Sequence, residues 1–164
     1  MSIEIAFPEK ILKKLEEISK SEEVLPEEII HEAVLEYLKL TDPETKTALH
    51  VNLSERYFDE ADEHIKKEDY VQASEKLWEA ASQMVKAVAA KRNLELRSHG
   101  DLNRFVADVR REVNEPEIRR VWQIATSLHQ NFYEAWLPGE TVKESVEDIK
   151  RFREMLERIL HQQP

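Results

Sequence analysis

A short span in the second half of the chain has the residue types and spacing for metal-free chemistry on phosphodiesters. Arg92 is followed directly by the polar Asn93, and six residues separate Arg92 from His99. A guanidinium can bind phosphate through two parallel hydrogen bonds, and a neutral imidazole can accept a proton. The start of a helix and neighbouring arginines both disfavour added positive charge, so we expect His99 to be neutral near pH 7. The pattern predicts an anion site in which Arg92 and His99 are the catalytic residues.

The surroundings of this span are basic, although the protein is acidic. The 164-residue chain has a formal net charge of −10. Residues 86–111 contain seven cations and three acidic side chains, a local balance of +4. We therefore expect an anion to bind here, with Lys91, Asn93 and Arg97 as further phosphate or ligand contacts. The alternative is that the histidine only supports a helix start and the arginine is a solvated cation.

A second group of polar residues lies in the apolar-rich segment SLHQNFYEAW, residues 127–136. On a helix, His129 and Tyr133 lie one turn apart on the same side. Together with Asn131 they predict the rim of a pocket. The alternative is a buried histidine and tyrosine whose polar atoms are satisfied by neighbouring helices. If the two segments meet, His129 and Tyr133 would join Arg92 and His99 in one anion site.

The composition excludes several other classes of site. The chain has no cysteine, which rules out disulfides, thiolate metal sites and cysteine nucleophiles. We expect no metal and no cofactor. No apolar run approaches the ~20 residues of a membrane span, so we expect a cytoplasmic protein without membrane contact. The net charge also argues against broad, nonspecific binding of nucleic acid.

The apolar periodicity predicts five helices in the main body of the protein. Asp42 and Asp69 are expected to cap helices of about 43–67 and 70–92. Capping patterns are also present at Ser98 with Asp101, and at Thr141 with Glu144. A further helix is expected over about 116–136, between the helix that begins at Ser98 and the helix that begins at Thr141. The predicted fold class is all-α.

Residues 1–41 predict a small N-terminal arm that resembles the ribbon-helix-helix module. Residues 2–7 alternate between apolar and other side chains, which is typical of a short strand. Two helices should follow, beginning near Pro8 and Pro26, and the second should turn its apolar residues inward. Such a module pairs its strand with a second copy, so we expect the arm to dimerise. Residues 1–40 contain five cations and ten glutamates, which repel phosphate and make duplex DNA an unlikely partner.

Two segments carry a resemblance to a known family. DYVQASEKLWEAASQMVKAVAAKRNLELRSHGDLNR (residues 69–104) and SLHQNFYEAW resemble the archaeal PaREP paralogous-repeat family. The resemblance covers about 45–160. That family is similar to HEPN domains, which are small helical bundles that act as dimers. It implies that residues 42–164 form a HEPN-like helical bundle.

HEPN ribonucleases use an arginine, then a polar residue, with a histidine a few residues further on. Arg92, Asn93 and His99 match this pattern. One departure is the position, because the motif usually opens a late helix of the bundle and here lies between the second and third. The resemblance implies a homodimer or higher homo-oligomer that binds RNA or a nucleotide. Its enzymatic version is a metal-independent endoribonuclease, and the alternatives are a non-catalytic interaction module and a DNA-binding regulator that uses the arm.

Overall fold

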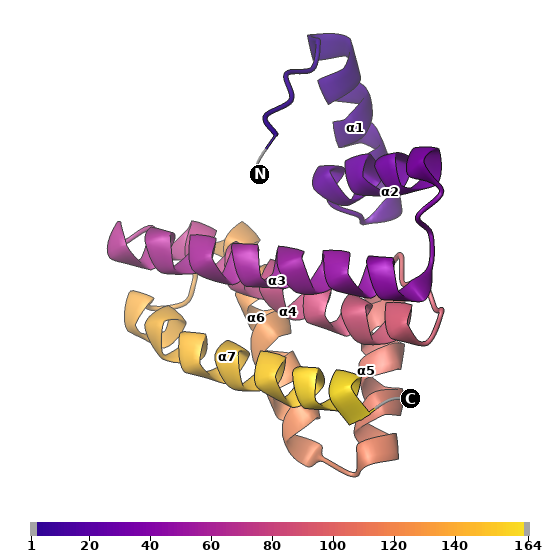
Figure 1. Ribbon diagram of the computed structural model, residues 1–164. Helices are drawn as coiled ribbons and strands as arrows, with labels where there is room; N and C mark the ends of the chain where they lie inside the picture. The colour runs from indigo at the N-terminus through magenta and orange to yellow at the C-terminus, as the bar shows by residue number, and fades with distance from the viewer. Residues whose placement is uncertain (1–2, 163–164) are drawn as a thin grey trace.

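The computed structural model describes residues 3–162, which form seven helices and no strand (Figure 1). The all-α class is confirmed. The sequence predicted about five helices, in the bundle. The described residues contain seven, so the count is not matched, and two of the seven lie in the N-terminal arm. The helices are α1 (Glu9–Glu22), α2 (Pro26–Leu38), α3 (Pro43–Lys66), α4 (Tyr70–Lys91), α5 (His99–Val113), α6 (Pro116–Glu134) and α7 (Gly139–Gln162).

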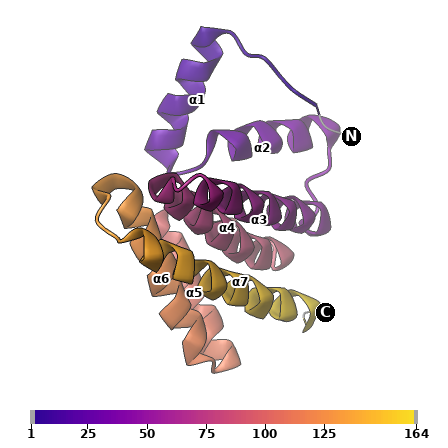
Figure 2. The ribbon, with the colours of Figure 1, turned by 90° about the vertical axis from the view of Figure 1, so that its left-hand side faces the viewer.

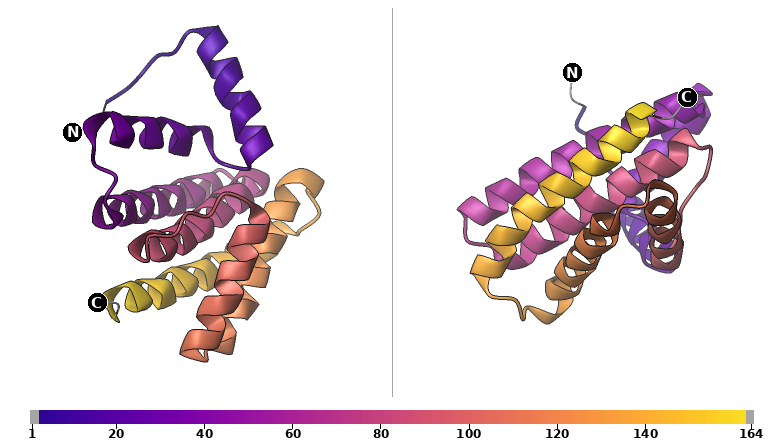
Figure 3. Two further views of the ribbon diagram at one scale, coloured as in Figure 1. Left: turned by 90° about the vertical axis from the view of Figure 1, so that its right-hand side faces the viewer. Right: turned by 90° about the horizontal axis from the view of Figure 1, so that it is seen from below.

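The long helix α4 is the centre of the fold. Sixteen of its 22 residues are buried, and it packs against α3, α5, α6 and α7 (Figure 3). Small side chains such as Ala73, Ala81 and Ala89 let these helices approach closely, and each is almost completely buried. Trp78 of α4, Trp122 of α6 and Phe152 of α7 form a chain of ring contacts through the core, with centroids 5.0 and 5.9 Å apart.

Side-chain caps determine where most of the helices begin. Asp42 accepts a hydrogen bond from the backbone N–H of Thr45, and Asp69 accepts one from Gln72. Ser98 and Asp101 form the complete capping box that the sequence predicts for α5. The box predicted at Thr141 is wrong, because α7 already begins at Gly139. Pro138 precedes this first turn, where the N–H that a proline lacks would have no intrahelical partner.

The predicted N-terminal strand is absent from the described residues. Residues 3–8 have no regular secondary structure, and Ser2 lies outside the part of the chain that the structure describes. A strand needs a neighbour to which its backbone N–H and C=O groups can bond, and residues 3–162 of a single chain offer none. The apolar side chains of this segment remain in solvent, with Ile3 75% and Ile5 56% exposed.

The arm helices α1 and α2 lie on one side of the α3–α4 pair, and α5, α6 and α7 lie on the other (Figures 1 and 2). Helix α1 has no buried residue, and the only buried residue of α2 is Glu28. The expectation that α2 turns its apolar residues inward is wrong for the single chain, since Tyr37 is 87% exposed and Val34 45%. No helix within residues 3–162 is both long and apolar enough to span a membrane.

Candidate functional site

A cleft of about 320 Å³ lies between the arm and the helical bundle. Three of the predicted site residues line it, namely His99, His129 and Tyr133. His99 is the first residue of α5, whereas the other two lie in the last turns of α6. The α4 face and the corner between α1 and α2 complete the wall. We call this the histidine cleft.

The aromatic rings in the cleft form a contiguous cluster. The centroids of the His99 and His129 rings are 4.9 Å apart, in an edge-to-face arrangement. His129 stacks on the buried Trp78 at 4.8 Å, and the ring of His99 meets the same indole edge-on at 5.5 Å. Tyr133 packs edge-on against His129 at 5.3 Å and is otherwise exposed. The two histidine segments of the sequence therefore meet, as the single-site hypothesis requires.

His129 is held in place by a carboxylate that the sequence reasoning did not select. Its Nδ1 atom lies 2.8 Å from Oε2 of Glu75 on α4, and both side chains are largely buried. A carboxylate can only accept a hydrogen bond, so the proton of this pair is on Nδ1 when the imidazole is neutral. Nε2 is then left with a lone pair. A histidine oriented in this way by a carboxylate is suited to act as a general base.

His99 makes its nearest polar contacts with the arm. Its backbone N–H donates to Oε2 of Glu23 at 3.0 Å, and its Nδ1 lies 3.9 Å from Oε1 of the same carboxylate. Burial is the main cause that lowers the pKa of His99, and the charge of His129 adds to it. Both effects favour an uncharged His99 imidazole near neutral pH.

The cleft also contains carboxylates that were not predicted. Glu79 is 7% exposed, and one of its oxygens accepts a hydrogen bond from Lys76 at 2.9 Å. Burial raises its pKa to about 7, and the nearby Glu75 and Glu60 also contribute to the increase. Glu79 therefore exchanges its proton in the same pH range as a histidine.

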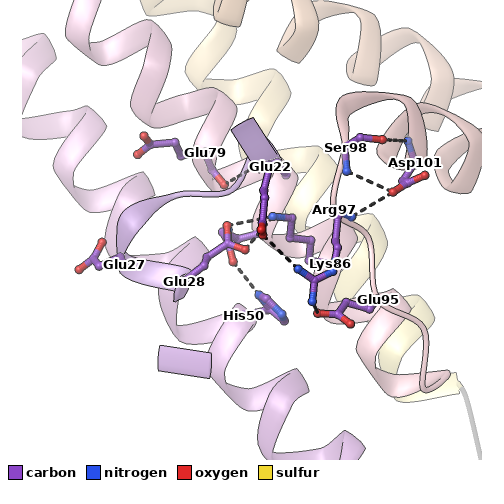
Figure 4. A network of polar contacts seen from close by, with 12 residues as sticks. Glu22, Glu27, Glu28, His50, Glu79, Lys86, Glu95, Arg97, Ser98 and Asp101 are labelled. Atoms are coloured by element: carbon purple, nitrogen blue, oxygen red, sulfur yellow. Dashed lines mark hydrogen bonds and ion pairs between the residues drawn. The ribbon is translucent and has the colours of Figure 1, made fainter. Parts of the chain in front are cut away.

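A buried ion pair joins Glu28 of α2 to Lys86 of α4 (Figure 4), and both residues line the cleft. Both oxygens of Glu28 accept hydrogen bonds from Nζ of Lys86, at 2.9 and 2.7 Å. Gln83 donates to the same carboxylate and bonds through its own oxygen to Nδ1 of His50, 2.7 Å away. Glu28 and Lys86 also line a second, smaller cavity of about 160 Å³, so this pair separates the two spaces.

The four predicted residues that precede α5 do not line the histidine cleft. Arg92 pairs with Glu112 at 2.9 Å and lies over the ring of Phe105, toward the other end of α5 from His99. Arg97 is paired with Glu22 and Glu95. The remaining two are Lys91, the last residue of α4, and Asn93, which is exposed, has a left-handed backbone and borders the smaller cavity. The expected convergence of Arg92 with His99 is therefore not present.

Asn131 is buried behind the cleft and does not line it. Its oxygen accepts hydrogen bonds from the backbone N–H groups of Trp136 and Leu137, at 2.9 and 2.7 Å. Its nitrogen donates to the hydroxyl of Ser74 on α4 at 2.8 Å. All of these bonds stay within the protein, so the geometry gives Asn131 a role in ending α6 and fixing the turn to α7.

The residues that were missed lie on a single face of α4. Glu75, Glu79, Ser82 and Lys86 follow one another at intervals of three or four positions, which places them in one row along the helix. All of them line the cleft. The signal was available in the sequence as polar side chains at helical spacing along an alanine-rich helix.

Two comparisons with known proteins found matches to this chain. Residues 49–153 match the Archaeal PaREP1/PaREP8 family. The chain belongs to this family. A crystal structure of a protein from Sulfolobus solfataricus resembles the PaREP chain described here with a TM-score of 0.58 and 30% sequence identity, over 65% of this chain and 94% of the other. No curated protein matches the chain. The family match begins within α3 and leaves the arm outside it.

Proposed function

We propose that this PaREP protein is a HEPN-like bundle that binds single-stranded RNA or a nucleotide in the histidine cleft. The observation that carries the proposal is the meeting of His99 and His129, from helices distant in sequence, over the Glu75 carboxylate and the Trp78 indole. Imidazoles of this kind transfer protons, and exposed aromatic rings such as that of Tyr133 stack on nucleobases. Single-stranded RNA offers both an unstacked base and a 2′-hydroxyl beside a phosphate.

The enzymatic form of the proposal is metal-independent cleavage of RNA. His129, oriented by Glu75, accepts the proton of the 2′-hydroxyl at Nε2, and the oxygen attacks the adjacent phosphate. The bond from phosphorus to the 5′-oxygen of the next nucleotide breaks, this oxygen takes a proton from solvent, and His129 returns its own proton to solvent. The products are a 2′,3′-cyclic phosphate and a free 5′-hydroxyl. The His99 and His129 rings are in contact, so no phosphate fits between them. In this arrangement His99 lies on the same side of the phosphate as His129, and it donates a hydrogen bond to a phosphate oxygen.

Homodimerisation through the arm is part of the same proposal. The arm exposes apolar side chains on both helices and on the segment before them, among them Ile5, Leu12, Val34 and Tyr37. Patches of this kind on a soluble chain mark contact surfaces. Helix α1 has a lysine-rich first half and a glutamate-rich second half, so two antiparallel copies would place opposite charges together. The non-catalytic interaction module draws its support from the same surface.

The experiment is a binding and cleavage assay in EDTA. We expect a fluorescently labelled single-stranded RNA to bind the wild-type protein in anisotropy measurements. If the chemistry operates, denaturing gels should show products with 2′,3′-cyclic phosphate ends. His129→Ala removes the base and should slow cleavage by about 10²–10⁴-fold. His161→Ala, at the exposed end of α7, is the matched control and should cleave like wild type.

The outcomes separate the possible roles of the cleft. Cleavage by His129→Ala at the wild-type rate would exclude the proposed chemistry. Equal RNA binding by the wild type, His99→Ala and Tyr133→Ala would exclude the cleft as the binding site. In that case the ring cluster only holds α4, α5 and α6 together, and the interaction module becomes the better description.

A further inference from the structure

The corner between α1 and α2 attaches the arm to the bundle mainly through carboxylates. Residues 22–28, which we call the acidic corner, contribute four of them (Figure 4). Glu22 pairs with Arg97 at 3.3 Å, and Glu28 pairs with Lys86 at 2.7 Å. Glu27 pairs with Arg56 at 2.6 Å. The fourth, Glu23, accepts from the backbone N–H of His99.

The apolar part of this attachment is small. Within the acidic corner, Val24 is the only buried apolar residue, and the partly buried Leu25 packs beside Leu53 and Tyr57. Helix α1 buries nothing. Arg97 and Glu22 are each about half exposed, so water and salt weaken this ion pair. The acidic corner itself therefore contacts the bundle mainly through charged groups, with Val24 and Leu25 as its buried or partly buried apolar residues.

The bundle presents three cations beneath the acidic corner, and two of them have a second carboxylate partner in the bundle, Glu60 for Arg56 and Glu95 for Arg97. Arg56, Lys86 and Arg97 come from α3, α4 and the connection to α5, and each pairs with a carboxylate of the corner. His99 adds a backbone N–H at a helix start, a position that favours a negative group. With the corner in place, the cleft is lined by Glu23 and Glu28 in addition to Glu75 and Glu79 of α4, and this acidic lining disfavours a phosphate.

We propose that the carboxylates of the acidic corner occupy the sites of the ligand's phosphates. Single-stranded RNA enters the histidine cleft by displacing the acidic corner. This inference rests on the proposed function and adds its regulation. Glu22 and Glu23 occupy the positions that phosphates take beside Arg97 and His99. Displacement removes Glu23 and Glu28 from the lining of the cleft and separates Lys86 from Glu28, while Arg97 and Arg56 keep their bundle partners. The arm thereby closes the histidine cleft until RNA displaces it.

The test compares two variants of α1 with the same change of charge. In Glu22→Gln/Glu23→Gln the carboxylates that contact the bundle are neutralised. In the control, Glu16→Gln/Glu17→Gln, the carboxylates pair with Lys20 and Lys14 of α1 itself. Affinity is measured by anisotropy with a labelled oligouridylate. We expect the first variant to bind roughly tenfold more tightly than the control, since two partly exposed contacts are lost from the closed state.

Opening of the arm is measured separately, with spin labels on cysteines placed at Lys13 of α1 and Lys150 of α7. The chain has no native cysteine, so the labels are specific. We expect the distance to lengthen when RNA binds, and to be longer in Glu22→Gln/Glu23→Gln even without RNA. RNA binding to the wild type with no change in this distance would overturn the displacement of the arm but leave the proposed function intact. Absence of RNA binding in both variants and the wild type would overturn both.

Discussion

Replacement of Asn131 by alanine should destabilise the protein without removing a ligand contact. The substitution deletes the acceptor for two backbone N–H groups and the donor to Ser74, at a residue that is 1% exposed. A buried polar group left without a partner costs about 1–3 kcal/mol. The two N–H groups are only partly buried, so water replaces some of the loss, and we expect about 2–4 kcal/mol in the free energy of unfolding.

The measurement is urea unfolding followed by circular dichroism at 25 °C, with Gln130→Ala as the matched control. Gln130 is the preceding residue of α6 and is exposed, so its substitution should change stability by less than about 0.5 kcal/mol. RNA binding by folded Asn131→Ala should equal that of the wild type. The reasoning is refuted if Asn131→Ala is as stable as the control, or if it loses RNA binding while its unfolding curve is unchanged.

Three further predictions concern other parts of the molecule. Burial raises the pKa of Glu79 to about 7, so the folded state binds more protons than the unfolded state between pH 4.5 and 7, and this contribution to stability is lost as pH rises through that window. Glu79→Gln should therefore flatten the decline of unfolding free energy between about pH 5 and 8, and an unchanged pH profile would contradict the assignment. Leu12→Glu with Val34→Glu should lower the mass measured by light scattering if the arm dimerises, whereas a constant mass would refute dimerisation through this face. Glu75→Gln should alter the pH profile of RNA cleavage by changing the basicity and tautomer of His129, with little effect on affinity; a purely structural role would leave that profile unchanged.

Helix positions in this chain could be predicted because their causes are local. Asp42, Asp69 and Ser98 bond to backbone N–H groups three residues further on, so a short stretch of sequence is sufficient to place each start. The strand predicted at residues 2–7 could not be decided in this way, because a strand depends on a pairing partner elsewhere. The same holds for α2, whose inward face depends on what covers it. Local patterns thus predicted the bundle better than the arm.

The candidate site shows the same division between local and long-range causes. His99 was selected by its spacing from Arg92 in a basic span, and His129 as part of a polar group in an apolar segment. Their contact depends on how α5 and α6 pack. Arg92 is close to His99 in sequence, but α4 ends at Lys91 and the pairing with Glu112 directs the guanidinium along α5. Proximity in sequence therefore does not bring these two side chains together. Glu75 was missed because its role depends on a residue 54 positions away.

The row of polar residues on α4 explains why the arm and the cleft occur together. A central helix can bury all of its apolar faces against α3, α5, α6 and α7, but a row containing Glu75, Glu79 and Lys86 cannot enter that core without partners. The row must face water, a ligand or a polar cover. In this protein its two ends are satisfied differently: His129 of the bundle pairs with Glu75, while Glu28 of the arm pairs with Lys86. The end next to His129 is fixed within the bundle, whereas the end next to the arm depends on a carboxylate that the arm supplies.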